Sequence, residues 1–524
     1  MKKLYMIWFT CLIGLLITAC YDDNGNYDYR KIGEVQIDGL EETYECVAYQ
    51  DVLHVEPKVT ITDGSSDLEY FWTLNLTPGS STTSEKIKIE LDTIGRERVL
   101  DYPITEKAGA YDLTLWAKNK ANGATSIETV SLSVVTPFSE GFYLLKEING
   151  GTDLDLHLKD GSYVMDILEA KDGQPMPGAP VSIGLDPTYS FINAQTEYEI
   201  TKAVTICTEN DVRISNIEDM SVIYTYNTMF LGEIPTGEKP YYIWRNYFGV
   251  GYTCDKGIYF SYQAPSYQLL GTGKFGLPVL VNDSEGTKPS FYGVISSGCW
   301  FFFDELKGRL LYLDFNGSLH TFKDEDEEGK KQPYPINGIP HKLKYFGINY
   351  IAADKETNGY ILFEDENNVD KLYIYHMVLS TTNIYNPIKK VIEVDASSKL
   401  HEADLFATYE STAKVMYFVA NNQIYLYDLE QQVEEPLNPT GMVTGEEITY
   451  IKNYYWKEDA VTGDNFDYLV FATHQNGKYK VYMYNILGGK PNGGPVRVLE
   501  GDGKVVSMRF VDKDMKIDST IPAL

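Results

Sequence analysis

The chain has 524 residues, which is more than one ordinary hydrophobic core can hold, so the sequence predicts more than one domain. Aspartate and glutamate outnumber lysine and arginine by 75 to 45, and a surface with a formal net charge of −30 repels phosphates, which argues against nucleic acid as a partner. The 6 cysteines lie far apart and form no C-x-x-C pair, which excludes a disulfide scaffold and a zinc ribbon.

Residues 1–19 have the pattern of a signal peptide. Lys2 and Lys3 precede the apolar stretch Leu4–Ile17, which is too short for a comfortable membrane span. Two small residues and then Cys20 follow, and this order resembles the lipobox of bacterial lipoproteins. The resemblance implies lipidation of Cys20 and cleavage before it, and a plain secretory signal followed by a chance cysteine is the alternative. No other apolar run approaches about 20 residues, so we expect contact with the membrane through the lipid anchor alone.

Residues 20–30 are expected to form a flexible tether. Asp22 and Asp23 stand close behind Cys20, and polar and glycine residues continue the segment. Acidic residues in this place resemble the surface-export signal of gut-type Gram-negative bacteria that carry SusC/SusD-type transporters. The resemblance implies a lipoprotein of the outer membrane that faces the cell surface, and a solvated linker facing the periplasm is the alternative.

Residues 31–136 are predicted to form an immunoglobulin-like β-sandwich. Runs of alternating apolar residues predict strands at Val52–Thr62 (interrupted by Pro57), Leu68–Leu74, Ile87–Leu91, 112–118 and 126–135. We expect Trp72, which lies in the middle of its strand, to fill the core of this domain. The stretch Gly109–Val135 resembles a PKD-type module, which has a Gly-x-Tyr entry, an alternating strand, an Asn/Gly turn and a closing strand.

A second tryptophan of this domain, Trp116, is predicted to lie on the opposite face of its strand. Tyr111, Leu113, Leu115 and Ala117 share one face by the two-residue period of a strand, which leaves Trp116 among polar side chains. An exposed tryptophan suggests a docking surface. Packing against the second domain is the alternative.

Residues 137–524 contain a series of predicted β-hairpins at a spacing of roughly fifty residues, which is typical of propeller blades. In Val415–Leu429, two runs of β-branched and aromatic residues flank a turn at Asn421 and Asn422. The other turns are at Asn149–Gly151, Glu209–Asp211, Asp255–Gly257, Glu305–Gly308, Glu364–Asn368 and Gln475–Gly477. A hairpin alone cannot bury a face in water, so the copies must stack. The sequence therefore predicts an all-β protein whose second domain is a divergent β-propeller of about seven four-stranded blades.

The known repeat signatures of propellers are missing from this domain. None of the 6 tryptophans precedes an aspartate, and double glycines do not recur once per repeat, so neither the WD nor the kelch pattern is present. A large β-sandwich or two smaller barrels remain the alternatives. A propeller must lock its first blade to its last, so we expect the final strand, Val505–Phe510, to lie beside Gly141–Glu147 in one sheet.

The sequence shows no motif for catalysis or metal binding. G-x-S-x-G and H-E-x-x-H are absent, and no two of the 7 histidines are close in sequence. Gly271, Gly273 and Gly276 have the spacing of a dinucleotide fingerprint, but a strand-like run follows them where the fingerprint needs a helix. We therefore expect no catalytic residue, no metal and no cofactor, although the many acids leave open an opposed carboxylate pair of the glycosidase type.

Four cysteines remain in the predicted domains, namely Cys46, Cys207, Cys254 and Cys299. We expect buried free thiols, and a bridge from Cys254 to Cys299 is the alternative.

Aromatic clusters are the candidate binding residues, in a chain that has 42 tyrosines. Tyr241–Trp244 and Tyr454–Trp456 lie just upstream of predicted hairpins, and flat rings stack on sugars or cover peptide backbones at little entropic cost. The alternative is that these clusters are the innermost strands of their blades. The candidate ligand- or partner-binding residues are therefore Trp116, Tyr241, Tyr242, Trp244, Tyr454, Tyr455 and Trp456.

The chain as a whole resembles the PKD-like lipoproteins that are often encoded beside SusC/SusD-type outer-membrane importers. The resemblance depends on Cys20, Gly109–Val135, Gly141–Glu147 with Thr152–Asp155, and the closing run Gly503–Val506. It implies an accessory surface lipoprotein of a nutrient-import complex, with the importer and its lipoproteins as partners and an oligopeptide or glycan as ligand. A propeller-type enzyme that degrades glycans or peptides is the first alternative, and a purely structural importer subunit is the second.

Overall fold

The computed structural model describes the chain in segments, and of residues 92, 350, 351, 456, 457 and 465 it describes the backbone alone. The segments are 33–48, 51–62, 67–77, 92–106, 108–138, 140–263, 271–282, 284–351, 356–380, 384–409, 411–457 and 465–511. The chain divides into two compact units, Met1–Val135 and Thr136–Leu524.

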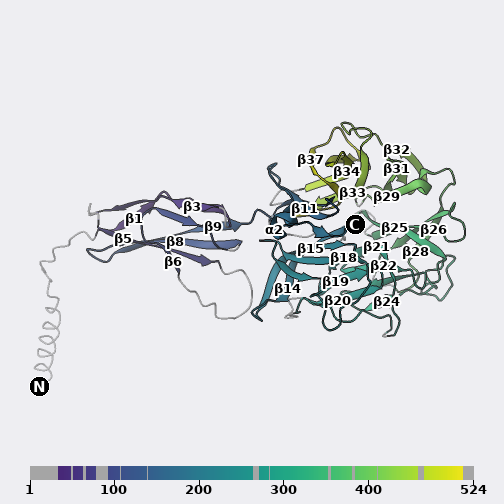
Figure 1. Ribbon diagram of the computed structural model, residues 1–524, viewed down its shortest axis with the longest axis horizontal. Coiled ribbons are helices and arrows are strands. Elements are labelled where there is room, and N and C mark those ends of the chain that lie inside the picture. The colour runs from purple at the N-terminus through teal and green to yellow at the C-terminus, as the bar shows by residue number, and fades with distance from the viewer. Residues whose placement is uncertain are drawn as a thin grey trace, which may run out of the picture. The chain divides into compact units, whose positions relative to one another are not determined.

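The first unit is a β-sandwich (Figure 1). Its strands are β1 (Val35–Asp38), β2 (Thr43–Val47), β3 (Val52–Val55), β4 (Lys58–Ile61), β5 (Leu68–Leu76), β6 (Asp92–Gly95), β7 (Leu100–Pro103), β8 (Gly109–Asn119) and β9 (Thr125–Val135). The main sheet has the order β2-β9-β8-β5-β6, and β1 with β4 and β3 with β7 form two smaller sheets. The strand expected at Ile87–Leu91 lies outside the described residues.

Trp72 fills the core of the sandwich, as predicted. Its side chain is 0% exposed, and its indole N–H donates to the carbonyl of Glu97 at 3.0 Å, so the one polar atom of the ring is satisfied. Leu113 and Leu115 of β8 are also 0% exposed, and they pack into the same apolar cluster. The two-residue period of β8 thus places its apolar residues on the buried face of the main sheet.

The second unit is a ring of seven antiparallel sheets, and the strand labels follow one another around a common centre in Figure 1. Blade 1 contains β10 (Gly141–Ile148), β11 (Gly151–His157), β12 (Tyr163–Val164), the helix α2 (Ile167–Asp172), β13 (Met176–Pro177) and β38 (Lys504–Val511). Blade 2 contains β14 (Pro180–Ile192), β15 (Tyr198–Thr208), β16 (Val212–Asn216) and β17 (Val222–Thr225). In the described residues, blade 3 has three strands, β18 (Pro240–Arg245), β19 (Gly249–Cys254) and β20 (Gly257–Tyr262).

The remaining blades continue in chain order. Blade 4 contains β21 (Pro289–Ser296), β22 (Cys299–Asp304), β23 (Arg309–Leu313) and β24 (Leu319–Thr321). Blade 5 contains β25 (His341–Ile351), β26 (Glu356–Asp365), β27 (Leu372–Val378) and β28 (Ile388–Glu393), and the short helix η2 (Lys399–Glu402) follows it. Blade 6 contains β29 (Ala403–Thr408), β30 (Val415–Ala420), β31 (Gln423–Asp428) and β32 (Val433–Pro436). Blade 7 contains β33 (Glu447–Lys457), β34 (Asn465–Gln475), β35 (Lys478–Leu487), β36 (Lys490–Pro491) and β37 (Arg497–Asp502).

The predicted hairpins are the central strand pairs of the seven blades. In blade 6, β30 pairs with β31 from Val415 opposite Asp428 to Ala420 opposite Gln423. The turn between them has φ of 50° at Asn421 and 60° at Asn422, a conformation that asparagine tolerates better than most residues. The prediction of an all-β chain with a β-sandwich as its first domain and a propeller of about seven blades is therefore confirmed.

The last strand closes the ring in the predicted way. Strand β38 pairs with β10 from Val511 opposite Gly141 to Lys504 opposite Glu147, and β10 pairs with β11 on its other side. The innermost strand of the first blade thus comes from the end of the chain, and β38 also contacts β14 of blade 2 and β33 of blade 7. This arrangement removes the open edge that a ring of separate blades would otherwise expose.

The four cysteines of the described segments are buried and free, so Cys254 and Cys299 do not form a bridge. Burial raises the pKa of Cys207 to about 12 and that of Cys299 to about 11, so both stay protonated thiols at neutral pH. In the described part of the chain, no helix has the length and apolar character needed to span a bilayer.

Candidate functional site

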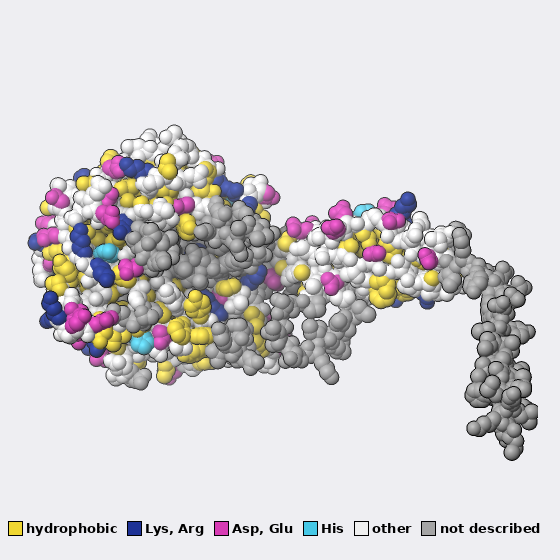
Figure 2. Space-filling view, turned by 180° about the vertical axis from the view of Figure 1, so that it is seen from behind, with side chains coloured by type: hydrophobic (Ala, Val, Ile, Leu, Met, Phe, Trp, Pro, Cys, Tyr) yellow, Lys and Arg dark blue, Asp and Glu magenta, His cyan; other side chains and the backbone are white. Residues whose placement is uncertain are grey.

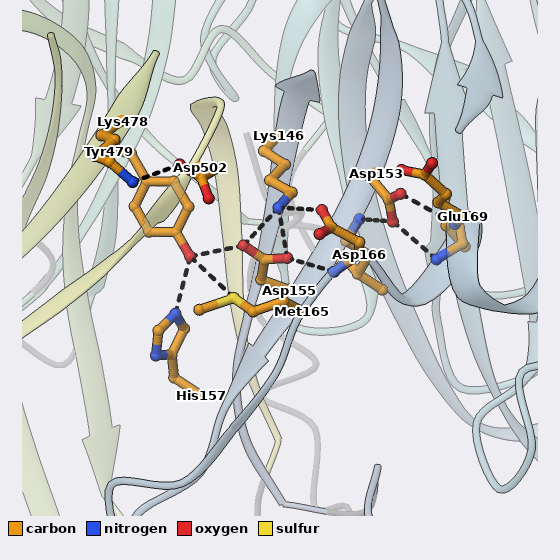
Figure 3. Close-up of polar contacts among 12 residues, drawn as sticks. Lys146, Asp153, Asp155, His157, Met165, Asp166, Glu169, Lys478, Tyr479 and Asp502 are labelled. Carbon is orange, nitrogen blue, oxygen red and sulfur yellow. Dashed lines mark hydrogen bonds and ion pairs between the residues drawn. The ribbon is translucent and has the colours of Figure 1, made fainter. Parts of the chain in front are cut away.

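The seam between blades 1 and 7 contains a buried network of charged and polar side chains (Figure 3). Strand β10 carries Lys146, the adjacent strand β11 carries Asp155, and β35 of blade 7 carries Tyr479. The side chain of Lys146 is 1% exposed and that of Asp155 is 0% exposed, so both charges lie out of water. A buried charge is costly unless a partner and hydrogen bonds compensate it, so each contact of this network matters.

The sequence of β11 explains why acids lie inside this seam. The two-residue period places Asp153, Asp155 and His157 on one face of the strand and Leu154 and Leu156 on the other. The two leucines are 0% exposed and pack into an apolar cluster between blades 1 and 2. The opposite face of the strand is also buried, and its polar side chains therefore need partners inside the protein.

The carboxylate of Asp155 is the centre of the network. Lys146 Nζ lies 2.7 Å from Asp155 Oδ1 and 2.7 Å from Asp166 Oδ1, so one ammonium group bridges two carboxylates. The backbone N–H of Asp166 donates to Asp155 Oδ1 at 2.8 Å, and the Tyr479 hydroxyl donates to Asp155 Oδ2 at 2.7 Å. Both oxygens of Asp155 thus accept hydrogen bonds, and one of the donors comes from the other blade.

His157 completes the network on the side of blade 7. Its Nε2 lies 2.9 Å from the hydroxyl oxygen of Tyr479. Because the single proton of this hydroxyl is donated to Asp155, His157 must donate from Nε2, which fixes the tautomer with Nδ1 unprotonated.

Asp153 holds the short helix α2 next to the network. Its carboxylate accepts the backbone N–H groups of Leu168 at 2.8 Å and Glu169 at 3.0 Å, and that of its own neighbour Leu154 at 2.7 Å. Asp166, the residue before the helix, makes no side-chain cap, so Asp153 provides the cap from the adjacent strand. The helix start is thereby fixed where Asp166 reaches Lys146.

The protonation states follow from burial and from these partners. Burial alone would lower the pKa of Lys146, but the carboxylates of Asp155 and Asp166 outweigh it and raise the pKa above its usual value. Burial, followed by the positive charges of Lys146 and Arg497, lowers the pKa of His157 to about 4. At neutral pH, Lys146 is therefore charged and His157 is neutral. Neither group has the pKa near 7 that suits a general acid or base, and the network fits the task of clamping two blades together.

The candidate binding residues of β18 lie mainly inside the seam between blades 3 and 4. Tyr242 is 2% exposed and Trp244 is 4% exposed. The ring of Trp244 stacks on that of Trp300 with centroids 5.4 Å apart, and Trp300 stacks on Phe302 at 4.3 Å. Tyr242 and Trp244 therefore cannot stack on a ligand, and their place in this core corrects the expectation of a binding role for both. Tyr241 is half-buried and meets the edge of a phenylalanine ring of blade 4.

The candidate residues of β33 are divided between core and surface. Tyr454 is 8% exposed, and its hydroxyl donates to the carbonyl of Met508 in β38, so it belongs to the closing seam rather than to a ligand surface. Tyr455 is 36% exposed. The side chain of Trp456 lies outside the described part of the structure, as does Cys20.

Trp116 lies on the face of β8 that the sequence predicted, away from the sandwich core. It is half-buried, and its indole N–H faces the hydroxyl of Thr73 at 3.4 Å. Phe71 and Ile127 lie opposite it on the two adjacent strands, and Ile127 is 48% exposed. The expected face is confirmed, and the role of Trp116 in docking stays a prediction.

Lys146, His157 and Tyr479, which take part in the network between blades 1 and 7, were not predicted from the sequence. The signal that could have indicated them is the spacing of Asp153 and Asp155 within a strand whose other face is apolar. Two acids on one face of a strand inside a propeller need a cation and hydroxyl donors nearby. The sequence does not say which of its 45 lysines and arginines provides the cation.

Comparison with known proteins identifies one part of the chain. Residues 20–180 match the model of the PKD-like family. The chain carries a PKD-like domain. The match begins at the cysteine of the predicted lipobox and ends where β14 begins, so it includes both the sandwich and the strands of blade 1 up to β13. A search of curated proteins found no match.

Two of the solved structures to which the chain is similar come from the bacterium Bacteroides thetaiotaomicron. A quinonprotein alcohol dehydrogenase-like protein from strain VPI-5482 is 14% identical with a TM-score of 0.38, over 90% of this chain and 97% of that one. The extracellular domain of a putative one component system is 8% identical with a TM-score of 0.24, over 78% of this chain and 65% of that one.

Proposed function

We propose that this protein is a lipid-anchored accessory protein of the bacterial cell surface that serves a SusC/SusD-type nutrient importer and binds oligopeptides or glycans for it. The observation that carries the proposal is the order of residues at the N-terminus, where a short apolar stretch is followed by Cys20 and then by Asp22 and Asp23. The PKD-like domain, which begins at this cysteine, supports the same proposal.

The propeller suits a binding protein because it is a closed and rigid support. Its ring is locked by β38 and by the buried clamp of Lys146, Asp155 and Tyr479. Turns on a rigid scaffold hold binding residues at fixed positions and reduce the entropy that binding would otherwise cost.

The first experiment tests the anchor. The full chain is expressed in a Gram-negative host that carries a SusC/SusD-type importer, and its membranes are washed with high salt. We expect the native chain in the membrane fraction and the Cys20→Ala variant in the soluble fraction, because a single acylated cysteine is the proposed attachment. Cys11→Ala, which changes a cysteine within the proposed signal peptide, is the matched control and should stay with the membrane. A Cys20→Ala protein that still sediments would contradict the lipoprotein assignment.

The second experiment tests the surface. Protease added to intact cells should digest the native protein, whereas the variant Asp22→Asn/Asp23→Asn should be protected until the cells are lysed. Protection of the native protein on intact cells would place it in the periplasm.

The third experiment tests the partner. The lipidated protein is solubilised in mild detergent and purified, and the proteins that accompany it are identified by mass spectrometry. We expect a SusC-type transporter and its SusD-type lipoprotein in the eluate. Recovery of the folded protein without either subunit would overturn the proposed assembly.

A further inference from the structure

Blades 3 and 4 display a group of aromatic side chains where their strands end in turns. We call Tyr247, Phe248, Tyr262 and Phe315 the aromatic strip. Tyr247 and Phe248 lie in the turn between β18 and β19, Tyr262 ends β20, and Phe315 lies in the turn between β23 and β24. In an antiparallel blade these three places share one edge, because the first and third strands run in the same direction.

The strip is contiguous across the seam between the two blades. The rings of Phe248 and Phe315 meet edge to face with centroids 5.4 Å apart. The hydroxyl of Tyr262 donates to the carbonyl of Asn316, the residue after Phe315. Residues of both blades therefore meet at the strip, through one pair of rings and one hydrogen bond to the backbone.

The ring of Tyr247 packs against Gly298, in the turn between β21 and β22 of blade 4. A β-carbon at Gly298 would overlap the ring of Tyr247, and Gly298 also has a φ of +75°, which side chains rarely adopt. In the same turn, the buried amide of Asn246 accepts the backbone N–H groups of Phe248 at 3.0 Å and Gly249 at 2.8 Å. The rings are thus fixed before any ligand arrives.

The rings remain open to solvent although they are fixed. Tyr247 is 65% exposed, Tyr262 is 47% exposed and Phe315 is 39% exposed. Hydrophobic side chains recur at many places on the face of the propeller that Figure 2 shows, and a single exposed ring means little. Here three exposed rings lie at one seam, and each of them contacts the other blade. Such a group indicates a binding surface.

The backbone and charged groups beside the strip are already used within their turns. The Asp314 carboxylate accepts the N–H groups of Asn316 and Ser318 at 2.9 Å each and lies 2.9 Å from His320 Nε2. The backbone N–H of Asn246 donates to the carbonyl of Gly249 at 3.0 Å, and that of Asp314 donates to Ser318 at 3.0 Å. The N–H groups of Asn246 and Asp314 are thus not free to pair with an extended peptide, and the main feature that the strip offers a ligand is its exposed rings.

We infer that the aromatic strip binds a neutral glycan chain, whose sugar rings lie on Tyr247, Tyr262 and Phe315. The C–H groups on the face of a pyranose carry partial positive charge and pack on the negative face of an aromatic ring. The formal net charge of −30 disfavours an anionic polysaccharide. This inference rests on the proposed binding function and selects the glycan over the oligopeptide as its ligand.

The test uses the full chain with Cys20→Ala, which keeps both domains and removes the lipid. Native gels are cast with amylopectin, arabinoxylan, galactomannan or mixed-linkage β-glucan, and the retardation of the protein is measured. We expect at least one polysaccharide to retard the chain. The variant Tyr247→Ala/Tyr262→Ala/Phe315→Ala should bind about tenfold more weakly or not at all, while its thermal unfolding stays cooperative.

Two further variants separate the strip from general effects. Tyr163→Ala removes a 62% exposed tyrosine of blade 1 and should leave retardation unchanged. Tyr247→Phe keeps the ring, so its affinity should stay within about threefold of that of the parent chain, because ring stacking is the main contact.

The possible failures are distinguishable. No retardation by any of the four polysaccharides, or equal retardation of the triple variant, overturns the glycan strip. Binding of tryptic casein peptides that the triple variant loses also overturns it, although the proposed binding function then stands. Recovery of the importer with the lipidated protein tests the proposed function independently, because that experiment does not depend on the strip.

Discussion

Two seams of the same propeller are built from different chemistry. Between blades 3 and 4, the rings of Trp244, Trp300 and Phe302 stack on one another in an apolar core. Between blades 7 and 1, an apolar cluster is joined by the buried ion pair of Lys146 and Asp155, which Tyr479 reaches from the other blade. The first seam joins blades that follow one another in the chain, and the second joins the first and last blades of the ring.

The difference has a physical reason. The chain connection between consecutive blades already keeps them next to each other, so side chains at their seam need only to pack without voids. Blade 1 and blade 7 are connected through the rest of the ring, and apolar packing alone would tolerate several ways of sliding them past each other. A charged pair and directed hydrogen bonds favour one arrangement, since any slip would leave a buried charge without its partner.

Removal of the closing strand should break the second seam completely. Deletion of everything after Gly501 removes the buried side chains of Val505, Met508 and Phe510 from the contact with β10. At roughly 2 kcal/mol for each buried side chain, the loss approaches the whole stability of an ordinary domain. We expect loss of cooperative thermal unfolding and proteolytic cleavage within Gly141–Ile148. A truncated chain that is cut first in blade 7 and stays protected in blade 1 would contradict the closure argument.

Loss of the buried cation should have the next largest effect. Lys146→Ala leaves Asp155 buried without its ion-pair partner, which we expect to cost about 3–5 kcal/mol of unfolding free energy in urea titrations. The matched control is Lys478→Ala, which removes an ion pair with Asp502 whose side chains are 72% and 63% exposed. The control should leave the urea midpoint unchanged. Equal effects of the two variants would show that the clamp does not stabilise the seam.

Acid should weaken the closing seam through His157. Its pKa is lowered from 6.5 to about 4 in the folded chain, so below pH 6.5 the unfolded chain binds a proton that the folded chain does not. Stability should therefore fall as pH decreases from about 6.5 to 4, by about 2–3 kcal/mol at pH 4.5. Urea unfolding at pH 7 and 4.5 measures this loss. In His157→Gln, the decrease in unfolding free energy between these two pH values should be smaller by that amount. An identical loss in the variant would assign the acid sensitivity to other groups.

Overpacking the aromatic seam should have the smallest effect of the four. A β-carbon at Gly251 would overlap the ring of Trp244, and one at Gly293 would lie 2.6 Å from Trp300 Nε1. We expect Gly251→Ala to cost about 1–3 kcal/mol, because the stacked rings have little room to move. Gly276→Ala, where nothing lies within 4 Å of the new carbon, is the control and should change the midpoint little. No loss in Gly251→Ala would mean that this seam yields more easily than its packing suggests.

The sequence revealed the middle of each blade better than its edges. Hairpins such as β30–β31 combine β-branched and aromatic residues with an asparagine turn, so both pattern and turn chemistry indicate them. Outer strands such as β12, with Tyr163 and Val164, and β36, with Lys490 and Pro491, are two residues long and have no period to detect. The prediction that Val505–Phe510 would pair with Gly141–Glu147 is confirmed, because it followed from the need of a ring to close rather than from local pattern.

The candidate site was less accessible to sequence reasoning. Tyr242 and Trp244 occur in an aromatic cluster, but composition cannot distinguish rings that lie between blades from rings that face solvent. Tyr247, which does face solvent, lies in a turn only three residues after Trp244, and Phe315 is the one aromatic residue in the turn between β23 and β24. Their proximity depends on the stacking of two blades, which no local pattern encodes.

The position of β38 has a consequence for the time at which the protein folds. The strands β10 and β11 of blade 1 are synthesised before the other blades, but its innermost strand is Lys504–Val511, so the blade stays incomplete until all the other blades have been made. Contacts between residues so far apart in sequence form slowly. A newly made chain therefore cannot close its ring while it is still growing. The proposed export requires the protein to cross a membrane unfolded. The delay is then an advantage, because the ring cannot close before β38 is available to complete blade 1.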